Sequence, residues 1–303
     1  ALYQPLDPAF QYRNDELFAE DVKLADIAAS VGAPVYVYSS ASIARQYRRL
    51  RDALNEAAIE ALICYAVKAN SNQAVLATLR HMGAGADVVS MGEMTRALAA
   101  GIPADKIVFA GVGKTADEMK AALEAGILQF NVESEPELER LQAIASAMGK
   151  KASVALRINP DVDAKTHAKI TTGTSENKFG VPIDHAREIA LKSKDWSHVA
   201  VEAISMHIGS QILDLQPYEQ AFERMAALAK DLIAQGVELK RLDVGGGLGI
   251  AYSHDATPPA DQVEKYAAMI KKHFAGFKLP MVLEPGRYMV GNAGLLLTEV
   301  VYV

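Results

Sequence analysis

The sequence of 303 residues lacks the features that would direct it to a membrane or an oxidising compartment. Its single cysteine, Cys64, excludes a disulfide within the chain and suits a reducing environment. No apolar run approaches the about 18 residues of a membrane span, and residues 1–7 lack the basic and apolar regions of a signal peptide. We therefore expect a cytoplasmic protein without membrane contact.

An excess of positive charge is also missing. The formal net charge is −6 and no block rich in lysine or arginine stands out, which argues against a nucleic-acid partner. Because 50% of the residues are hydrophobic, a large core can form and global disorder is not expected. A chain of this length suits one large α/β barrel or two domains of ordinary size.

Short runs rich in β-branched residues alternate with helical patterns along most of the chain. A helix over about 40–58 precedes the first run, and helix-start and helix-end signals recur between the others. Eight strands alternating with eight helices favour a (β/α)8 barrel, a TIM-like α/β fold, over a doubly wound open sheet. The predicted strands are 62–66, 86–89, 107–110, 127–131, 152–158, 199–208, 240–244 and 281–284.

Individual helix boundaries carry recognisable residues. Ser134 with Glu137 three positions later predicts a capping box at the start of one helix. Gly101, Gly126 and Gly236 stand where helix C-caps are expected. These signals support the alternation of strands and helices from which the barrel is inferred.

The segments on either side of the barrel predict a second, all-β domain. We assign 39–284 to the barrel, 1–38 to the N-terminal part of the β domain and 285–303 to its C-terminal start. Within these segments, 35–38 and 295–303 have strand composition. The chain stops inside the last of these runs, so we expect the β domain to be incomplete in it.

Lys68 closes the apolar run 62–67 and is the most informative residue of the chain. A buried amine is costly unless it is paired or used, and a lysine can form a Schiff base with an aldehyde cofactor. The structural alternative is a lysine whose stem lies along the strand end while its ammonium group reaches water. Asp87 and Glu93, at and after the second strand, are candidates to orient Lys68 or water, with a structural role equally open.

Two further signals end strands on the predicted catalytic face, where the C-terminal ends of barrel strands meet. His207 ends the sixth strand, and the run Gly245-Gly246-Gly247 ends the seventh. Consecutive glycines let backbone N–H groups approach a phosphate, although they also mark an ordinary tight turn. A histidine here either stacks on the ring of an aromatic cofactor or is a satisfied core residue.

A third signal ends the eighth strand in the segment Glu284-Pro285-Gly286-Arg287. Glu284 either pairs with Arg287 or forms a hydrogen bond to a pyridine nitrogen, which would make that ring an electron sink. Arg287 supplies a cationic fork that suits phosphate or carboxylate, and Ser210 adds a hydroxyl donor. No metal belongs to this expected site.

Taken together, these motifs resemble those of the bacterial diaminopimelate decarboxylases, a family of the alanine racemase/ornithine decarboxylase-like fold type of pyridoxal-phosphate enzymes. The resemblance extends from about Phe10 to Val303, and its motifs are specific in combination although each alone is weak. The matching stretches are 65–72, 83–89, 130–136, 171–180, 207–215, 242–252 and 284–287.

The resemblance implies pyridoxal 5′-phosphate as cofactor, a small amino-acid substrate and a homodimer with shared active sites. It implies a cofactor Schiff base on Lys68, His207 against the ring, and Glu284 at the pyridine nitrogen, and these three are the expected catalytic residues. Arg287 would also lie near the substrate carboxylate. The implied cofactor-binding residues are Lys68, His207, Ser210, Gly245, Gly246, Gly247, Glu284, Pro285, Gly286 and Arg287.

The chain departs from the family pattern at a few turn and packing positions, namely Met91, Ala33 and Asn14-Asp15, where glycine, threonine and Asn-Gly are usual. The family's later Cys-Glu-Ser segment, a substrate arginine and a cofactor tyrosine would lie beyond Val303. Cys64, inside the first barrel strand, does not correspond to the family's catalytic cysteine.

The function implied first is decarboxylation of meso-diaminopimelate to L-lysine and CO2, the last step of lysine biosynthesis. Related decarboxylases of ornithine, arginine or carboxynorspermidine are the alternative within the fold type. A racemase of the alanine type is expected to have arginine at the position of Glu284. A non-catalytic regulator is expected to have lost the cofactor, against which the intact Lys68, glycine run and Glu284 argue.

Overall fold

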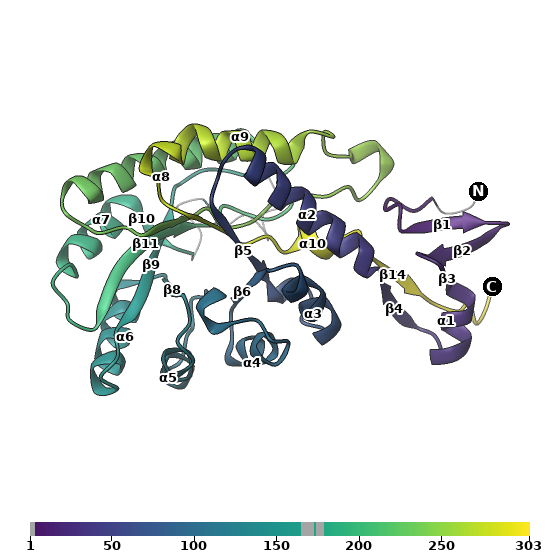
Figure 1. The fold of residues 1–303 in the computed structure, drawn as a ribbon, viewed down its shortest axis with the longest axis horizontal. Coiled ribbons are helices and arrows are strands. Elements are labelled where there is room, and N and C mark those ends of the chain that lie inside the picture. Colours follow the sequence, from purple (N-terminus) through teal and green to yellow (C-terminus); the bar gives the residue numbers. More distant parts are fainter. Residues whose placement is uncertain (1–3, 165–172, 174–178) are drawn as a thin grey trace.

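The computed structural model describes residues 4–164, 173 and 179–303, and its centre is a closed barrel of parallel strands (Figure 1). The barrel strands are β5 (Ala61–Ala66), β6 (Gly85–Val88), β7 (Ile107–Phe109), β8 (Gln129–Val132), β9 (Ala152–Asn159), β11 (Val199–Met206), β12 (Arg241–Asp243) and β13 (Met281–Leu283). They are ordered β9-β11-β12-β13-β5-β6-β7-β8, and pairing of β8 with β9 closes the ring. A short additional strand, β10 (Val181–Pro182), pairs with β9.

The predicted barrel is therefore confirmed, with each of the eight predicted strands present and its ends displaced by at most two residues. The predicted and observed strands agree because parallel strands that are buried on both faces consist of short apolar runs, which are easy to find in a sequence. Of the stretch 171–180 used for the resemblance, residues 173 and 179–180 are described and the others lie outside the described residues.

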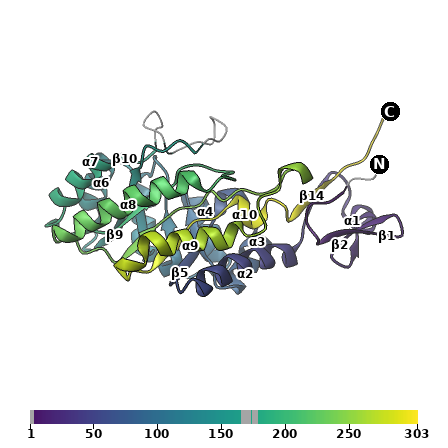
Figure 2. The same cartoon turned by 90° about the horizontal axis from the view of Figure 1, so that it is seen from above.

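Helices cover the outside of the barrel (Figures 1 and 2). Their apolar faces repeat every three or four residues, so each buries one side against the strands. Helix α9 shows this pattern with Val263, Tyr266, Ala267, Ile270 and Phe274 buried. The helices around the barrel are α2 (Ser40–Glu56), α3 (Gln73–His81), α4 (Met91–Ala99), α5 (Ala116–Ala125), α6 (Glu135–Ala147), α7 (Ile183–Lys192), α8 (Gln216–Ala234) and α9 (Gln262–Phe274).

The predicted capping box at the start of α6 is only half formed. Ser134 Oγ accepts a hydrogen bond from the Glu137 N–H, but the Glu137 carboxylate accepts from the Glu133 N–H and from Lys114 Nζ. The bond to an ammonium group is charge-assisted and stronger than a return bond to the N-cap backbone. A reciprocal capping box forms at Thr115 instead, at the start of α5.

The expected C-cap glycines behave as predicted. Gly126 ends α5 in the left-handed conformation with φ of 71°, and its N–H donates to the Ala122 carbonyl. Gly101 and Gly236, which follow the ends of α4 and α8, also have positive φ.

A small β unit lies at one end of the molecule, where the first described residues and the C-terminus also lie (Figures 1 and 2). It contains the antiparallel strands β1 (Phe10–Arg13), β2 (Glu16–Ala19) and β3 (Val22–Lys23), and the helix α1 (Leu24–Val31). Beside them, β4 (Val35–Tyr38) pairs antiparallel with β14 (Gly294–Leu297).

The predicted strand 295–303 forms only in its first part. Leu297 pairs with Val35, the first residue of β4, so β4 offers no partner to the residues that follow. Residues 298–303 are exposed and have no strand structure.

The interior of the barrel is unusual in its polarity. A small apolar cluster of Cys64, Val108 and Val282 occupies part of it. Beside this cluster, Gln129 pairs with Val108 and Asp243 pairs with Val282 in neighbouring strands, and both polar residues are 0% exposed. Within the described ranges, every helix is too short or too polar to cross a membrane.

Candidate active site

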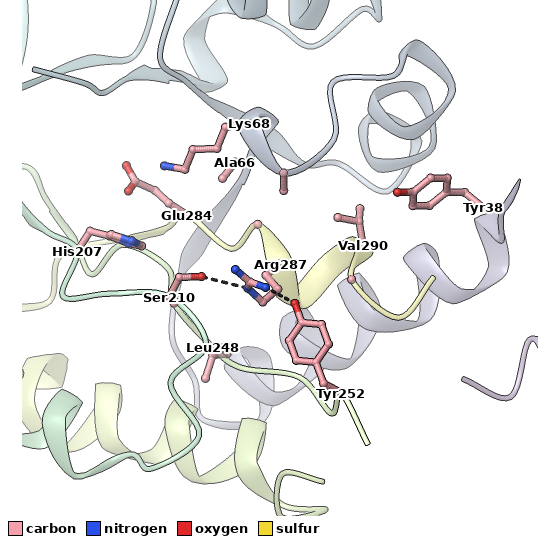
Figure 3. Close-up of a pocket in the computed structure, with 14 residues that line it drawn as sticks. Tyr38, Ala66, Lys68, His207, Ser210, Leu248, Tyr252, Glu284, Arg287 and Val290 are labelled. Atoms are coloured by element: carbon pink, nitrogen blue, oxygen red, sulfur yellow. Dashed lines mark hydrogen bonds between the residues drawn. The ribbon is translucent and has the colours of Figure 1, made fainter. Parts of the chain in front are cut away.

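A cavity of about 430 Å³ opens at the C-terminal ends of the barrel strands (Figure 3). Its lining comes from segments that follow β5, β11, β12 and β13, as the barrel fold requires for an active site. The lining residues are Tyr38, Ala66, Lys68, Ala69, His207, Ser210, Gly247, Leu248, Tyr252, Glu284, Gly286, Arg287, Val290 and Gly291.

Lys68 lies in a single 3-10 turn, Val67–Ala69, directly after β5, and its side chain extends toward the carboxylate of Glu284 (Figure 3). Its Nζ atom is 3.7 Å from Asp87 Oδ2, while Asp87 itself is only 1% exposed. The other oxygen of Asp87 has no hydrogen-bond partner. Burial and the nearby Glu284 raise the Asp87 pKa to about 8, which Lys68 only partly offsets.

Glu284 follows β13 and is 7% exposed. Its Oε1 accepts a hydrogen bond of 2.7 Å from Asn131 Nδ2. Burial first, and then the neighbouring carboxyl group of Asp243, raise the pKa of Glu284 well above its usual value. The structure thus gives Glu284 a neutral amide partner in the barrel interior, while the contacts of Arg287 are made elsewhere.

His207 follows β11 and faces the same cavity as Lys68 (Figure 3). The Gly246 N–H donates to His207 Nδ1 at 3.3 Å, which leaves the ring proton on Nε2. Burial, with the positive charges of Lys68 and Arg157, lowers the pKa of His207 well below its usual value. A neutral ring at this position can cover the face of a flat ligand.

The glycine run is required by the packing of the chain itself. A Cβ on Gly245 would lie 2.1 Å from the Met206 carbonyl oxygen, and one on Gly246 would lie 2.1 Å from the Glu284 carbonyl oxygen. These contacts draw the ends of β11, β12 and β13 together. Gly247 is the member of the run that lines the cavity.

Hydrogen-bond donors collect at the end of the cavity away from Lys68. Arg287 Nε donates to Ser210 Oγ at 3.2 Å, and its Nη1 donates to the hydroxyl of Tyr252 (Figure 3). The guanidinium carbon also lies 5.7 Å from the centre of the Tyr252 ring. This cluster combines a fixed cationic fork with a hydroxyl group, a suitable arrangement for an anion.

The remaining predicted residues lie around the cavity. Gly286 lines it, and the Pro285 carbonyl accepts from the Ala66 N–H at 3.0 Å, tying β13 to β5. Glu93, in the first turn of α4, accepts from the Val89 N–H at 2.8 Å and so holds the loop after β6. The predicted residues therefore gather at one site, with Glu93 bound to backbone at its edge.

Comparison with known proteins identifies the family of the chain. Residues 40–291 match the family model described as pyridoxal-dependent decarboxylase, pyridoxal binding domain. The chain belongs to this family. The matched range contains the whole barrel together with Lys68, His207, Glu284 and Arg287.

Relatives of this pyridoxal-dependent decarboxylase are named diaminopimelate decarboxylase. The protein of Pseudomonas aeruginosa is 50% identical over 97% of this chain and 70% of its own length, and that of Aquifex aeolicus is 45% identical over 100% and 70%. The crystal structure of diaminopimelate decarboxylase from Helicobacter pylori complexed with L-lysine superposes with a TM-score of 0.89 at 42% identity, covering 92% of this chain and 70% of that one.

Sequence reasoning missed the polar residues beneath and beside the cavity. Gln129, Asn131 and Asp243 form a hydrogen-bonded group inside the barrel, and a weak signal existed because Gln129 and Asn131 alternate with apolar residues in β8. Tyr252 was part of a matching stretch without an assigned role. The buried ion pair of Lys114 with Glu137 had no signal in the sequence, because Lys114 lies in the loop before α5 and Glu137 in the first turn of α6.

Proposed function

We propose that this chain catalyses the pyridoxal 5′-phosphate-dependent decarboxylation of meso-diaminopimelate to L-lysine and CO2, the last step of lysine biosynthesis. The observation that carries the proposal is the arrangement of the cavity. The Lys68 amine extends toward the Glu284 carboxyl group, and the donors of Ser210 and Arg287 lie at the other end. The relatives named diaminopimelate decarboxylase support the choice of substrate.

The residues present fit this cofactor. A volume of about 430 Å³ suits a small phosphorylated ring and part of a substrate. The amine, the buried carboxyl group and the anion-binding cluster correspond to the aldehyde, the ring nitrogen and the phosphate of the cofactor. When bound, pyridoxal 5′-phosphate supplies an aldehyde that condenses with amines and a pyridinium ring that withdraws electrons from the substrate Cα.

Each residue then has a defined task. Lys68 would hold the cofactor aldehyde through its Nζ atom. Glu284 holds a proton at the ring nitrogen, and the neutral His207 ring covers one face of the ring and excludes water. Ser210 and Arg287 would bind the phosphate group, and Arg287, which lines the cavity, would also be available to a substrate carboxylate.

The proposal is tested with labelled substrates. The purified protein loaded with pyridoxal 5′-phosphate is expected to release labelled CO2 from meso-diaminopimelate and to form L-lysine in equal amount. Ornithine and arginine, offered at the same concentration, are the matched alternatives. Faster release from either of them would move the chain to a related decarboxylase, and a cofactor-loaded protein inactive on all of them would refute the proposal.

We also propose that the protein is a cytoplasmic homodimer whose subunits share their active sites. The support is the resemblance to the family. The mass in solution, measured by light scattering, is expected to be about twice that of one chain. A monomer that retains full decarboxylase activity would contradict the shared site.

A further inference from the structure

A line of hydrogen bonds runs through the barrel interior and ends at Glu284. Arg241 Nε donates to Gln129 Oε1 at 2.6 Å, and Gln129 Nε2 donates to Asn131 Oδ1 at 2.8 Å. Asn131 Nδ2 then donates to Glu284 Oε1 at 2.7 Å. We call Arg241, Gln129 and Asn131 the amide relay, because two amides connect a guanidinium group to a carboxyl group.

The amide relay spans the barrel from one end to the other. Arg241 and Gln129 are the first residues of β12 and β8, whereas Glu284 follows the last residue of β13. At the starting end, Arg241 Nη2 donates to Ser153 Oγ and to the Leu128 carbonyl oxygen. The guanidinium group is therefore held on two sides and cannot easily turn away from Gln129.

The direction of every bond in the amide relay follows from the charge of Arg241. A guanidinium group only donates, so the Gln129 atom that faces it is the amide oxygen. The Gln129 NH2 group then faces Asn131 and also donates to Asp243 Oδ2 at 2.9 Å. Because an NH2 group only donates, Asn131 meets it with its oxygen and turns its own NH2 group toward Glu284.

The amide relay therefore fixes how one oxygen of Glu284 is used. Oε1 is an acceptor whether the carboxyl group is neutral or ionised, and it lies on the side of the barrel interior. The bond from Asn131 is stronger when Glu284 is ionised, so it opposes the effect of burial, which favours the neutral acid. The second oxygen is left for a ligand in the cavity that Glu284 lines (Figure 3).

We propose that Asn131 is a positioning residue for Glu284, and that Gln129 and Arg241 fix the direction in which the Asn131 amide points. This inference rests on the proposed function and deepens it. Asn131 holds one carboxyl oxygen and stabilises the negative charge, so that the other oxygen keeps a proton at the ring nitrogen of the cofactor.

The test is equilibrium binding of two probes, pyridoxal 5′-phosphate and its deaza analogue, in which a C–H group replaces the ring nitrogen. Both probes have the same aldehyde and phosphate groups, so the ratio of their dissociation constants isolates the contribution of the ring nitrogen. A relay residue with a merely structural role would change both constants by the same factor and leave this preference unchanged.

Asn131→Leu should lower the preference for pyridoxal 5′-phosphate by about fivefold or more. Opposite a ring nitrogen the variant loses a bond to an ionised Glu284, whereas opposite a C–H group it loses only a weaker bond to a neutral one. The matched control is Ser205→Ala on β11. Ser205 is buried, and its hydroxyl group has no hydrogen-bond partner among the described residues.

The control variant should keep the preference of the parent protein, because no hydrogen bond is broken. A preference in Asn131→Leu equal to that of Ser205→Ala would overturn the role of Asn131.

The direction of the amide relay is tested with Gln129→Glu, which has the same shape. The new carboxylate accepts from Arg241 but cannot donate to Asn131, so the Asn131 amide turns and presents its oxygen to Glu284. The preference should fall at least as far as in Asn131→Leu. The added negative charge alone would favour a protonated ring, so a preference equal to or above that of the parent would overturn the role of Gln129.

These measurements are independent of turnover. If the expected preferences are found but the protein releases no CO2 from meso-diaminopimelate, the proposed substrate is wrong while the role of Asn131 stands. If decarboxylation is normal and Asn131→Leu keeps the preference of the parent, only this inference fails. Should either variant not fold, Asn131→Val and Gln129→Met replace them, each with an expected fall in preference, and an unchanged preference would again overturn the role.

Discussion

Two groups of buried charged residues lie at the same end of the barrel and are built in opposite ways. In the first, which we call the paired network, Lys114 donates to Glu137 at 2.7 Å and Arg157 donates to Glu133 at 2.9 Å. Glu133 also accepts from the N–H groups of Gly111 and Gly180, so its lone pairs are occupied. Charge and hydrogen-bonding capacity are matched.

The second group, which we call the carboxyl cluster, consists of Asp87, Asp243 and Glu284. Three acidic groups are buried together, and the nearest cation, Lys68, lies 3.7 Å from Asp87 with a side chain that is 52% exposed. The pKa of each acid is raised, chiefly by burial. A fold gains no stability from such crowding, which is the pattern expected of a group retained for chemistry.

The largest expected effect is a loss of turnover when Lys68, the cation beside the carboxyl cluster, is replaced. Lys68→Ala should reduce decarboxylation by at least about a thousandfold, because the nucleophilic amine is lost. The unfolding free energy should change by less than about 1 kcal/mol, since the ion pair is partly exposed. Steady-state kinetics and urea unfolding measure both. A stable adduct with pyridoxal 5′-phosphate after borohydride reduction of the variant would contradict the assignment.

The matched variant in the paired network should give the opposite profile. Lys114→Met leaves the Glu137 carboxylate buried without its cation, at a cost of about 3–5 kcal/mol in unfolding free energy. The double variant Lys114→Met/Glu137→Gln should recover part of that loss, because the unpaired charge is gone. Urea unfolding of the three proteins tests this, and equal stability of the single variant and the parent would remove the distinction between the two groups.

A smaller effect is expected from neutralising one member of the carboxyl cluster. Glu284→Gln should lower kcat by about a hundredfold in cofactor-loaded protein, since a neutral amide holds the ring proton less firmly. Thermal stability should stay equal or rise, because a buried acid is removed. Unchanged kcat in fully loaded variant protein would exclude this role for Glu284.

The smallest effect is a dependence of stability on pH. Asp87 and Asp243 have pKa values raised to about 8 and about 7, so the folded state holds protons that the unfolded state releases. Their contribution is full below the unfolded pKa of about 4 and is lost as the pH rises through the folded values, by at most about 1.4 kcal/mol per pH unit for each group. The lowered pKa of His207 acts in the opposite direction, but only below its unfolded value of about 6.5.

Thermal unfolding of the cofactor-free protein between about pH 6.5 and 8 therefore isolates the acids. The melting temperature should fall as pH rises across this window, and Asp87→Asn should flatten the fall. The exposed Asp52 offers the control, since Asp52→Asn should leave the slope unchanged. A parent protein with a flat profile would show that the carboxyl cluster does not hold protons.

Residues of the carboxyl cluster can be predicted from the sequence better than those of the paired network. Lys68 and Glu284 were found because each ends an apolar strand, and barrel topology brings strand ends together. Asp243 also ends a strand, but it directly precedes the glycine run, and a polar residue at that position is equally typical of an ordinary turn. Its partner Gln129 lies on β8, three strands away around the closed ring, so this proximity exists only after the barrel closes.

Local signals failed where tertiary contacts compete with them. The Ser134 capping box lost its glutamate because Lys114, distant in sequence, offers Glu137 a charge-assisted bond. The strand predicted over 295–303 ends at Leu297, because β4 has only four residues to pair with it and the predicted apolar run is longer than that. In both cases the local sequence favours the predicted feature, and a contact with a residue or strand distant in the sequence decides whether that feature forms.

The pairing of β4 with β14 also has a consequence for the order of events during synthesis. Residue 294 follows residue 38 by 256 positions (294 − 38), so β4 leaves the ribosome long before its partner. At about 5–20 residues per second, that interval is about 13–50 s. Leu295 and Leu297 are also needed to cover the apolar cluster of Phe10, Ala19 and Leu24. The pairing of β4 with β14 is thus completed only after the barrel between them has been synthesised, and until then the cluster of Phe10, Ala19 and Leu24 lacks the cover of Leu295 and Leu297.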